Sequence, residues 1–217
     1  MSVGSLRLAL AAVLIGGLAL FALLAVVVGA GGAVGLDRGA FSLASDLRAP
    51  AALDVARVVT DAGAGFIAWP LALAVAALLA ARGSVRASLA LAGSTVLVVV
   101  LVGVAKDAVG RPRPPAALVG THGLSYPSGH SAYSTLWVAS ALALVLGLRD
   151  AISRRVRLAV LGGALAIALV IGLTRVYLRA HDLTDVLGGW ALGGATLAVC
   201  ALASGAIAGR RHNRSSR

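Results

Sequence analysis

The sequence predicts an all-α, polytopic membrane protein with six transmembrane helices and a polar site at one membrane edge. Of its 217 residues, 59% are hydrophobic and only 12% are charged, which is about half the charged fraction of a soluble domain. The charges also leave uncharged runs close to the 20 or so apolar residues that a helix needs to cross a bilayer. These two observations exclude an ordinary soluble domain.

We expect the spans in six uncharged runs, which are residues 8–29, 62–81, 87–105, 131–148, 158–174 and 186–209. The fourth and fifth runs are short, but each stops at an arginine. The first run is longer than the apolar core of about 7–15 residues in a signal peptide, so we expect a retained membrane anchor. Pro70 and the many glycines are compatible with spans, because membrane helices tolerate both.

Basic residues are concentrated on the side that would carry both termini. With six spans, that side holds 11 of the 19 Lys and Arg residues and one aspartate, Asp150, whereas the other side holds 8 and the remaining aspartates. The positive-inside rule therefore places both termini in the cytoplasm. The net charge of +11 thus reflects topology, and no nucleic-acid partner is expected. The basic tail, residues 210–217, is interpreted as a cytoplasmic flank that touches anionic lipid.

The residue inventory limits the chemistry. Cys200 is the single cysteine, which excludes an internal disulfide and metal sites built on cysteine pairs. The sequence contains no glutamate, so carboxylate chemistry must come from its eight aspartates. No linker or repeat divides the chain, and we expect one membrane-embedded domain over residues 1–217. The oligomeric state is left open.

Three connections lie on the predicted non-cytoplasmic side. The first, residues 30–61, contains the stretch AALDVARVV, whose apolar residues have helical spacing and predict a short interfacial helix. The second, residues 106–130, contains four of the six prolines and should be a rigid, non-helical loop. The third, residues 175–185, is much shorter. Their common side makes a shared site possible.

Six ionisable residues at the ends of the predicted spans face this side. They are Lys106, Arg113, His130, Arg175, His181 and Asp185. Ionisable residues in such positions are candidates for function. Phosphoryl transfer needs mainly positioning and charge stabilisation, which lysine and arginine provide. The set therefore suits a substrate with an anionic phosphorus centre.

Two short patterns strengthen this interpretation. PSGH, residues 127–130, directly precedes the fourth span, and a helix N-terminus favours a bound phosphate through its free N–H groups and dipole. Within it, Gly129 allows close backbone approach and Ser128 adds a hydroxyl donor. His181 and Asp185 are four residues apart, so on a helix they share one face, where the carboxylate can orient the imidazole.

Each of these features has an ordinary structural explanation when taken alone. A basic residue at a membrane edge is most often a snorkelling anchor. A histidine beside a helix start is most often a cap, and His-x3-Asp recurs by chance. Their combined order is much harder to explain in this way.

The order of these residues resembles the signature of a known family. It combines Lys-x6-Arg-Pro, PSGH and Arg-x5-His-x3-Asp. The matching residues are Lys106, Arg113 and Pro114, then residues 127–130, then Arg175, His181 and Asp185. Together they are similar to the tripartite signature of the type-2 phosphatidic acid phosphatase (lipid phosphate phosphatase) superfamily, whose membrane members have six spans. The signature region covers residues 106–185.

The resemblance implies a phosphomonoesterase or pyrophosphatase that works in two steps without a metal or cofactor. His181 would attack phosphorus to form a phosphohistidine, and Asp185 would orient it. His130 would protonate the leaving oxygen and later activate water. The residues expected to hold the phosphoryl oxygens are Lys106, Arg113, Arg175, Ser128 and the amide of Gly129.

Some polar residues depart from the signature or fall outside it. The family's usual serine before the third-motif arginine is Thr174 here, which leaves open any phosphate-binding role for this hydroxyl. We expect Arg111 and Arg179 to be loop or interfacial residues. His122, in the loop, and His212, in the tail, have no partner that the sequence indicates.

We therefore expect an enzyme that removes phosphate from an amphiphilic lipid at the non-cytoplasmic face of the bilayer. Candidate substrates are polyprenyl pyrophosphate such as undecaprenyl pyrophosphate, phosphatidic acid and phosphatidylglycerol phosphate. The composition, rich in Ala, Arg and Gly, is typical of a high-GC bacterial genome and favours the plasma membrane. One alternative is a soluble phosphate ester as the substrate. A second is a vanadium haloperoxidase, which the six spans disfavour. A third is a non-catalytic lipid-binding or transport protein, which would need polar or broken helices near the midplane.

Overall fold

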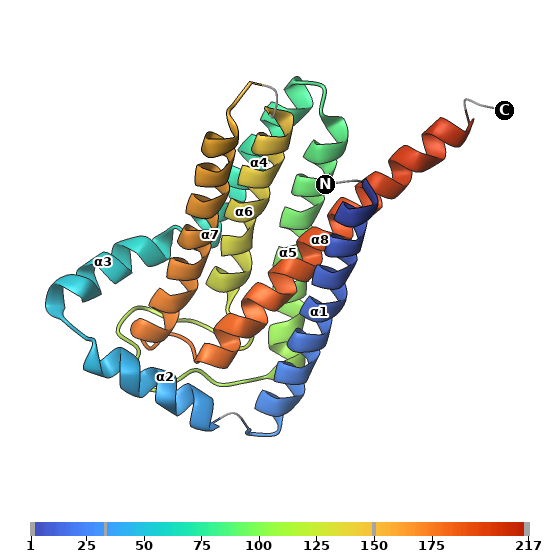
Figure 1. The fold of residues 1–217 in the computed structure, drawn as a ribbon. Coiled ribbons are helices and arrows are strands. Elements are labelled where there is room, and N and C mark those ends of the chain that lie inside the picture. Colours follow the sequence, from blue (N-terminus) through green and yellow to red (C-terminus); the bar gives the residue numbers. More distant parts are fainter. Residues whose placement is uncertain (1–2, 33, 149–150, 215–217) are drawn as a thin grey trace.

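The computed structural model describes residues 3–32, 34–148 and 151–214, with backbone only at Val3, at Val34 and beyond Ser204. These ranges contain eight α-helices and no strand, so the all-α prediction is confirmed (Figure 1). The helices are α1 (Val3–Gly29), α2 (Val34–Asp46), α3 (Pro50–Asp61), α4 (Gly65–Ala81), α5 (Val85–Val109), α6 (Gly129–Gly147), α7 (Arg154–Tyr177) and α8 (Leu183–Arg214). The side chains of the predicted basic tail, residues 210–217, lie outside the described part of the chain.

Five of these helices are long and apolar enough to cross a membrane: α1, α5, α6, α7 and α8. α3 and α4 meet at a bend of 45° and, counted together, supply a sixth candidate span. α4 begins three residues later than the predicted run, because Ala62, Gly63 and Ala64 form the turn that separates the two helices. Many side chains on these helices are both exposed and apolar, as lipid contact requires.

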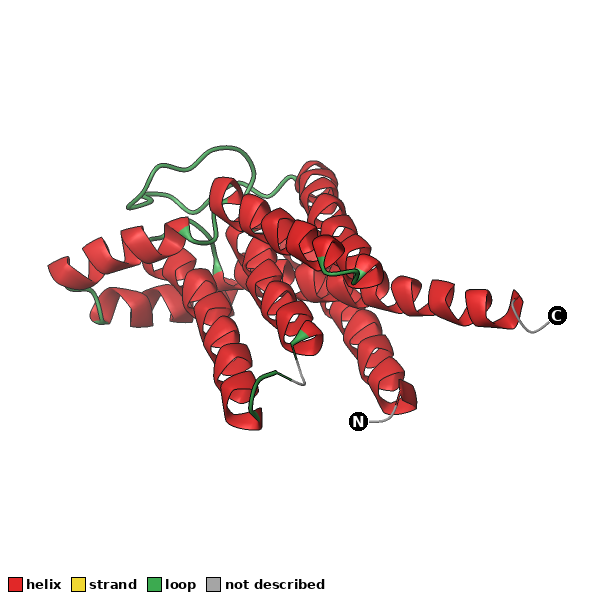
Figure 2. Ribbon diagram, turned by 90° about the horizontal axis from the view of Figure 1, so that it is seen from above, coloured by secondary structure: helices red, strands yellow, loops and turns green. Residues whose placement is uncertain are grey.

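One end of the helix bundle gathers the connections of interest. In Figure 1, the α5–α6 loop, the α7–α8 turn and α2 lie at the lower end, whereas α1 begins and α8 ends at the opposite end. Figure 2 shows the α5–α6 connection as a long loop crossing one face of the bundle. The structure therefore brings the three predicted connections to a common end of the molecule.

The structure adds a helix that the sequence pattern did not reveal. α2 lies within the predicted first connection, before α3, the short helix expected from the stretch AALDVARVV. α3 starts with Pro50 in its first turn, where the missing proline N–H costs nothing. The two helices are tied to α7 by Tyr177, whose hydroxyl donates to Leu47 O at 3.2 Å and accepts from Ala49 N–H at 3.1 Å.

Glycines on α8 allow α6 to lie directly against it. A Cβ atom on Gly189 would lie 2.5 Å from Ser128 O and 2.9 Å from Ser131 Cβ, and one on Gly193 would lie 2.6 Å from Thr135 Oγ1. Small residues permit this close approach of membrane helices. The contact fixes the first turn of α6 against the first turns of α8.

Gly189→Ala is therefore expected to destabilise the protein by about 1–3 kcal/mol, the usual cost of overpacking. Thermal unfolding in detergent should show a lower Tm. Gly163→Ala on α7 is the matched control, because a Cβ atom on Gly163 would meet nothing within 4 Å and alanine favours a helix. Equal Tm values for the two variants would contradict this account of the α6–α8 contact.

Candidate active site

The structure brings the six predicted ionisable residues to the same end of the bundle. Lys106 lies in the last turn of α5, His130 in the first turn of α6 and Arg175 in the last turn of α7. His181 lies in the α7–α8 turn. His130 interacts electrostatically with Lys106, Arg113, Arg175 and His181. The sequence patterns that are far apart in the chain thus form one cluster.

His181 and Asp185 form a buried imidazole–carboxylate pair. Nδ1 of His181 lies 3.3 Å from Oδ2 of Asp185, and their side chains are 2% and 0% exposed. On the other side of the ring, Nη1 of Arg113 lies 3.0 Å from Nε2. A guanidinium can only donate, so Nε2 must accept and the proton must lie on Nδ1. His181 is therefore in the Nδ1–H tautomer, which leaves a lone pair on Nε2.

The environment of His181 keeps its ring neutral. Burial lowers the pKa of His181 to about 4, although the hydrogen bond and the negative charge of Asp185 act in the opposite direction. The positive charges of Arg113 and Arg175 lower this pKa further. At pH 7 the imidazole is therefore uncharged, as a nucleophile requires.

Several donors hold the Asp185 carboxylate in place. Its Oδ2 atom accepts a short hydrogen bond from the Ser125 hydroxyl and one from the Asp182 backbone N–H at 3.0 Å, in addition to facing His181. Its Oδ1 atom lies 2.6 Å from Nη1 of Arg111. A buried carboxylate with this many donors is fixed in orientation and stabilised in its ionised form.

Arg113 connects the proline-rich loop to the pair. Its guanidinium donates to the backbone oxygens of His122, Gly123 and Ala180 at 2.8–3.2 Å, besides contacting His181. The planar fork of an arginine suits this simultaneous binding. Arg113 therefore both fixes the loop and places a positive charge beside Nε2 of His181.

Lys106 and Arg175 supply the other two cations. Lys106 Nζ donates to Leu124 O at 2.5 Å and to Ser125 O at 3.3 Å. Arg175 is only 4% exposed, and its Nη1 donates to the Thr60 hydroxyl at 2.8 Å. Its Nε is buried and has no hydrogen-bond partner among the described residues. An unpaired buried donor is costly, and it would be satisfied by an anion bound in the cluster.

The PSGH turn provides the start of α6. Ser128 is the N-cap: its fully buried hydroxyl accepts hydrogen bonds from Ser131 N–H and Oγ at 3.4 and 3.0 Å. Its backbone N–H donates to Asp185 O at 2.9 Å. Gly129 is the first residue of α6, so its N–H has no intrahelical acceptor. Ser128 can therefore cap α6 while the N–H of Gly129 stays available for a phosphate.

The structure corrects the expectation for Arg111. This residue does lie in the α5–α6 loop, but it belongs to the cluster, because its guanidinium contacts Asp185 directly and its side chain is only 14% exposed. Asp37 on α2 and Thr184 on α8, which the sequence did not single out, are bonded to the same guanidinium. The spacing Arg-x-Arg around a proline is the one signal that could have indicated a second functional arginine.

Other residues stay outside the cluster. The guanidinium of Arg179 lies over the ring of Phe41, 5.7 Å from its centre, so this arginine remains an accessory residue of the α7–α8 turn. The Thr174 hydroxyl donates to Ile171 O at 2.6 Å and is thus bonded within α7. Among the described residues, no group of three or more His, Cys, Asp or Glu side chains is arranged to hold a metal ion.

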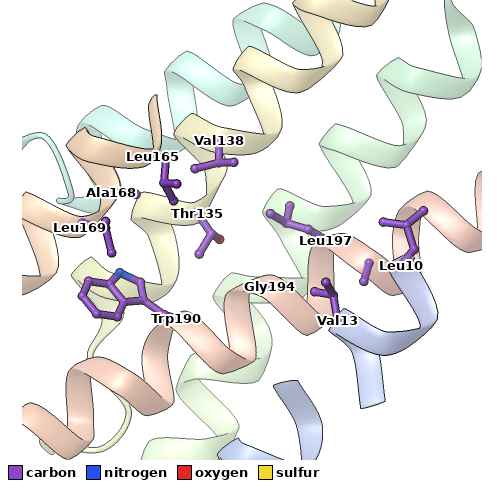
Figure 3. Close-up of a pocket in the computed structure, with 11 residues that line it drawn as sticks. Leu10, Val13, Thr135, Val138, Leu165, Ala168, Leu169, Trp190, Gly194 and Leu197 are labelled. Atoms are coloured by element: carbon purple, nitrogen blue, oxygen red, sulfur yellow. The ribbon is translucent and has the colours of Figure 1, made fainter. Parts of the chain in front are cut away.

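A cavity of about 360 Å³ lies elsewhere, between α1, α6, α7 and α8. Figure 3 shows Trp190, Leu169, Leu165 and Leu10 around it. Its lining side chains are apolar apart from the Thr135 hydroxyl and the Trp190 indole N–H. The hydroxyl donates to Ala132 O within α6, and the indole N–H has no hydrogen-bond partner among the described residues. None of the six clustered ionisable residues lines this cavity, so it is not a phosphate site.

Fold and site together define a class: a helical membrane protein whose buried imidazole–carboxylate pair is surrounded by cations at one end of the bundle. The chain belongs to the PAP2 superfamily, since residues 87–207, more than half of its length, match the model of that family. The matched region runs from the first residues of α5 into the last part of α8. The predicted family resemblance is therefore confirmed.

Similar proteins agree with this membership. Over 92 residues the chain is 38% identical to phosphatidylglycerophosphatase B of Bacillus subtilis (strain 168), a match that covers 42% of this chain and 44% of that relative, less than half of its length. The fold is similar to the crystal structure of the first transmembrane PAP2-type phosphatidylglycerolphosphate phosphatase from Bacillus subtilis. The TM-score is 0.78 at 28% identity, with 87% of this chain and 94% of the other covered. Aquifex aeolicus LpxE shares the fold with a TM-score of 0.51 at 23% identity, over 76% and 91% of the two chains.

Proposed function

We propose that this protein is an integral membrane phosphatase that hydrolyses lipid phosphate or pyrophosphate headgroups through a phosphohistidine on His181. The observation that carries the proposal is the geometry of His181: Nδ1 faces Asp185 while the Nε2 lone pair faces Arg113. The PAP2 membership and the phosphatidylglycerophosphatases among the similar proteins support it.

In the first step, Nε2 of His181 attacks phosphorus and forms the P–N bond while the bond to the leaving oxygen breaks. Asp185 stabilises the positive charge that develops on the imidazole. His130 donates a proton to the leaving oxygen, so that an alcohol or a phosphate monoester departs. The lipid alcohol, or the lipid phosphate monoester when the substrate is a pyrophosphate, diffuses away and the phosphoryl group stays on His181.

In the second step, His130 accepts a proton from water as the water oxygen attacks phosphorus. The P–N bond breaks, inorganic phosphate leaves and His181 returns to its neutral form. The same histidine thus acts first as an acid and then as a base, which returns the site to its starting state.

The cations stabilise the charge on the phosphoryl group in both transition states. Arg175 contributes its unpaired Nε, and Arg113 turns Nη1 from His181 to a phosphoryl oxygen as substrate binds. Lys106 adds a third charge, while the Gly129 amide and the Ser128 hydroxyl complete the set at the start of α6. A compact cation set of this kind selects a phosphate over a neutral headgroup.

The position of the site favours a lipid substrate. The cluster lies where three membrane-spanning helices end, so an amphiphile can keep its tail in lipid while its phosphate reaches the cations. We place this end on the non-cytoplasmic face, with both termini in the cytoplasm of a bacterial cell. Phosphate release by purified protein from phosphatidylglycerol phosphate, phosphatidic acid and polyprenyl pyrophosphate, compared with soluble phosphate esters of matched headgroup, tests the substrate class. Faster turnover of the soluble esters would favour the alternative substrate.

Activity is expected to persist when divalent cations are removed, because the charge stabilisation comes from Lys106, Arg113 and Arg175. Phosphate release should stay within about twofold of its starting rate after dialysis against EDTA, an effect far smaller than the loss of a catalytic metal would cause. Loss of activity that Mg²⁺ restores would contradict the metal-free mechanism.

A further inference from the structure

Arg111 lies at the centre of a buried polar network beside the His181–Asp185 pair. Its Nη1 donates to Asp185 Oδ1 at 2.6 Å and to Thr184 Oγ1 at 2.7 Å. Its Nη2 lies 2.8 Å from Asp37 Oδ2 and 3.0 Å from Asp182 Oδ2. The two terminal nitrogens of the guanidinium, which can only donate, thus make three hydrogen bonds and one further ion pair with protein oxygens. Arg111 is therefore not free to hold a phosphate with its fork.

We propose that Arg111 and Asp37 are positioning residues for the His181–Asp185 pair, with Arg111 as the counter-ion of Asp185 and Asp37 holding Arg111 from α2. The proposal rests on the function proposed above. It assigns a part in the reaction to the loop arginine outside the family signature and to a helix that precedes the matched family region.

The positive charge of Arg111 determines whether Asp185 needs a protonated His181 as its counter-ion. Asp185 is fully buried, and a buried carboxylate without a cation is strongly unfavourable. Arg111 supplies that cation at Oδ1 and leaves Oδ2 for Nδ1 of His181. Without Arg111, the cation best placed to balance Asp185 would be a protonated His181, which has no lone pair for attack. Arg111 therefore keeps the nucleophile neutral and in the productive tautomer.

Asp37 fixes Arg111 and the start of α8 together. One of its oxygens accepts from the Thr184 backbone N–H at 2.9 Å, and the other accepts from the Thr184 hydroxyl at 2.9 Å and from Arg111. An acidic residue at a helix N-terminus is favourable, and Asp37 is only 4% exposed. Asp37 thus joins α2, the loop and the first turn of α8, which carries Asp185.

Arg111→Met and Arg111→Lys test the proposal, with Arg179→Met as the matched control. We expect Arg111→Met to lower kcat by about 10- to 100-fold while KM changes less than about twofold, since Arg111 orients the pair and does not touch substrate. Arg111→Lys should recover part of kcat, because it restores the charge without the fork. Arg179→Met should keep both constants, since Arg179 contacts Phe41 instead of the cluster.

A spectroscopic measurement separates positioning from structural support. Nitrogen-15 NMR of protein labelled at histidine reports the tautomer and charge of His181, whose signals are identified by their absence from His181→Ala. At pH 7 the wild type should show a neutral ring protonated at Nδ1. Arg111→Met, or Asp37→Asn if the former does not fold, should show a larger imidazolium or Nε2–H fraction.

Three results would overturn the proposal. They are a folded Arg111→Met with kcat within twofold of wild type, an increase in KM alone, and a loss of activity that only matches a smaller folded fraction while the His181 signals stay unchanged. Failure of the proposed function has a different outcome, because wild-type protein would then release no phosphate. The NMR measurement needs no activity and so tests the network independently.

Discussion

Replacing His181 with alanine is expected to lower kcat for phosphate release by at least about 10⁴-fold, the loss typical of removing a catalytic nucleophile. The remaining cations can still bind the phosphate, but no group is left in place of Nε2 to form the covalent bond. Initial rates with detergent-solubilised protein and a saturating lipid phosphate measure the effect. Expression and membrane insertion should be unchanged, because the spans are not altered.

His122→Ala is the matched control for this variant. His122 is exposed in the α5–α6 loop, and Arg113 contacts its backbone oxygen, which the substitution keeps. Its activity should stay within about twofold of wild type. Turnover by His181→Ala above about 1% of wild type would rule out His181 as the nucleophile.

Arg175→Lys is expected to lower kcat/KM by about 100-fold or more, comparable with the loss of one transition-state donor at an oxyanion site. Lysine keeps the positive charge but cannot contact both the Thr60 hydroxyl and a phosphoryl oxygen, as the guanidinium of Arg175 can through Nη1 and Nε. Steady-state kinetics over a range of substrate concentrations separates the contributions of kcat and KM.

Arg179→Lys provides the comparison, because it makes the same chemical change four residues away and outside the cluster. Its kcat/KM should remain within about threefold of wild type. Similar effects of the two substitutions would show that Arg175 acts through the general charge of this face, and would contradict a direct contact with phosphate.

The parts of the site with local sequence signals could be predicted. Long uncharged runs identified α1 and α5 to α8 as candidate spans, but only the α4 part of the bent α3–α4 pair. His181 and Asp185 are four residues apart, so their proximity follows from one helical turn. The ends of consecutive spans alternate between the two membrane faces, which placed Lys106, His130 and Arg175 on one side. These inferences need only periodicity and topology.

The network around Arg111 could not be predicted in the same way. Arg111 and Arg113 flank Pro112, and in an extended chain side chains two residues apart point to the same side, so both arginines reach the His181–Asp185 pair, Arg111 at Asp185 and Arg113 at His181. Asp37 is 74 residues from Arg111 and 147 from Thr184 in sequence. Nothing in the pattern around Asp37 distinguishes it from a solvated aspartate. Such contacts depend on how α2 packs, which hydrophobic periodicity does not specify.

The central claim is that phosphate passes through a covalent bond to His181, and trapping this intermediate in His130→Ala tests it most directly. With an activated aryl phosphate the leaving group needs no proton, so the first step should proceed while the second lacks its base. We predict a burst of about one phenol per protein and an acid-labile, alkali-stable phosphate on the peptide that contains His181, absent from the double variant His130→Ala/His181→Ala. Phosphate on another residue, or steady turnover with no labelled protein, would contradict the account.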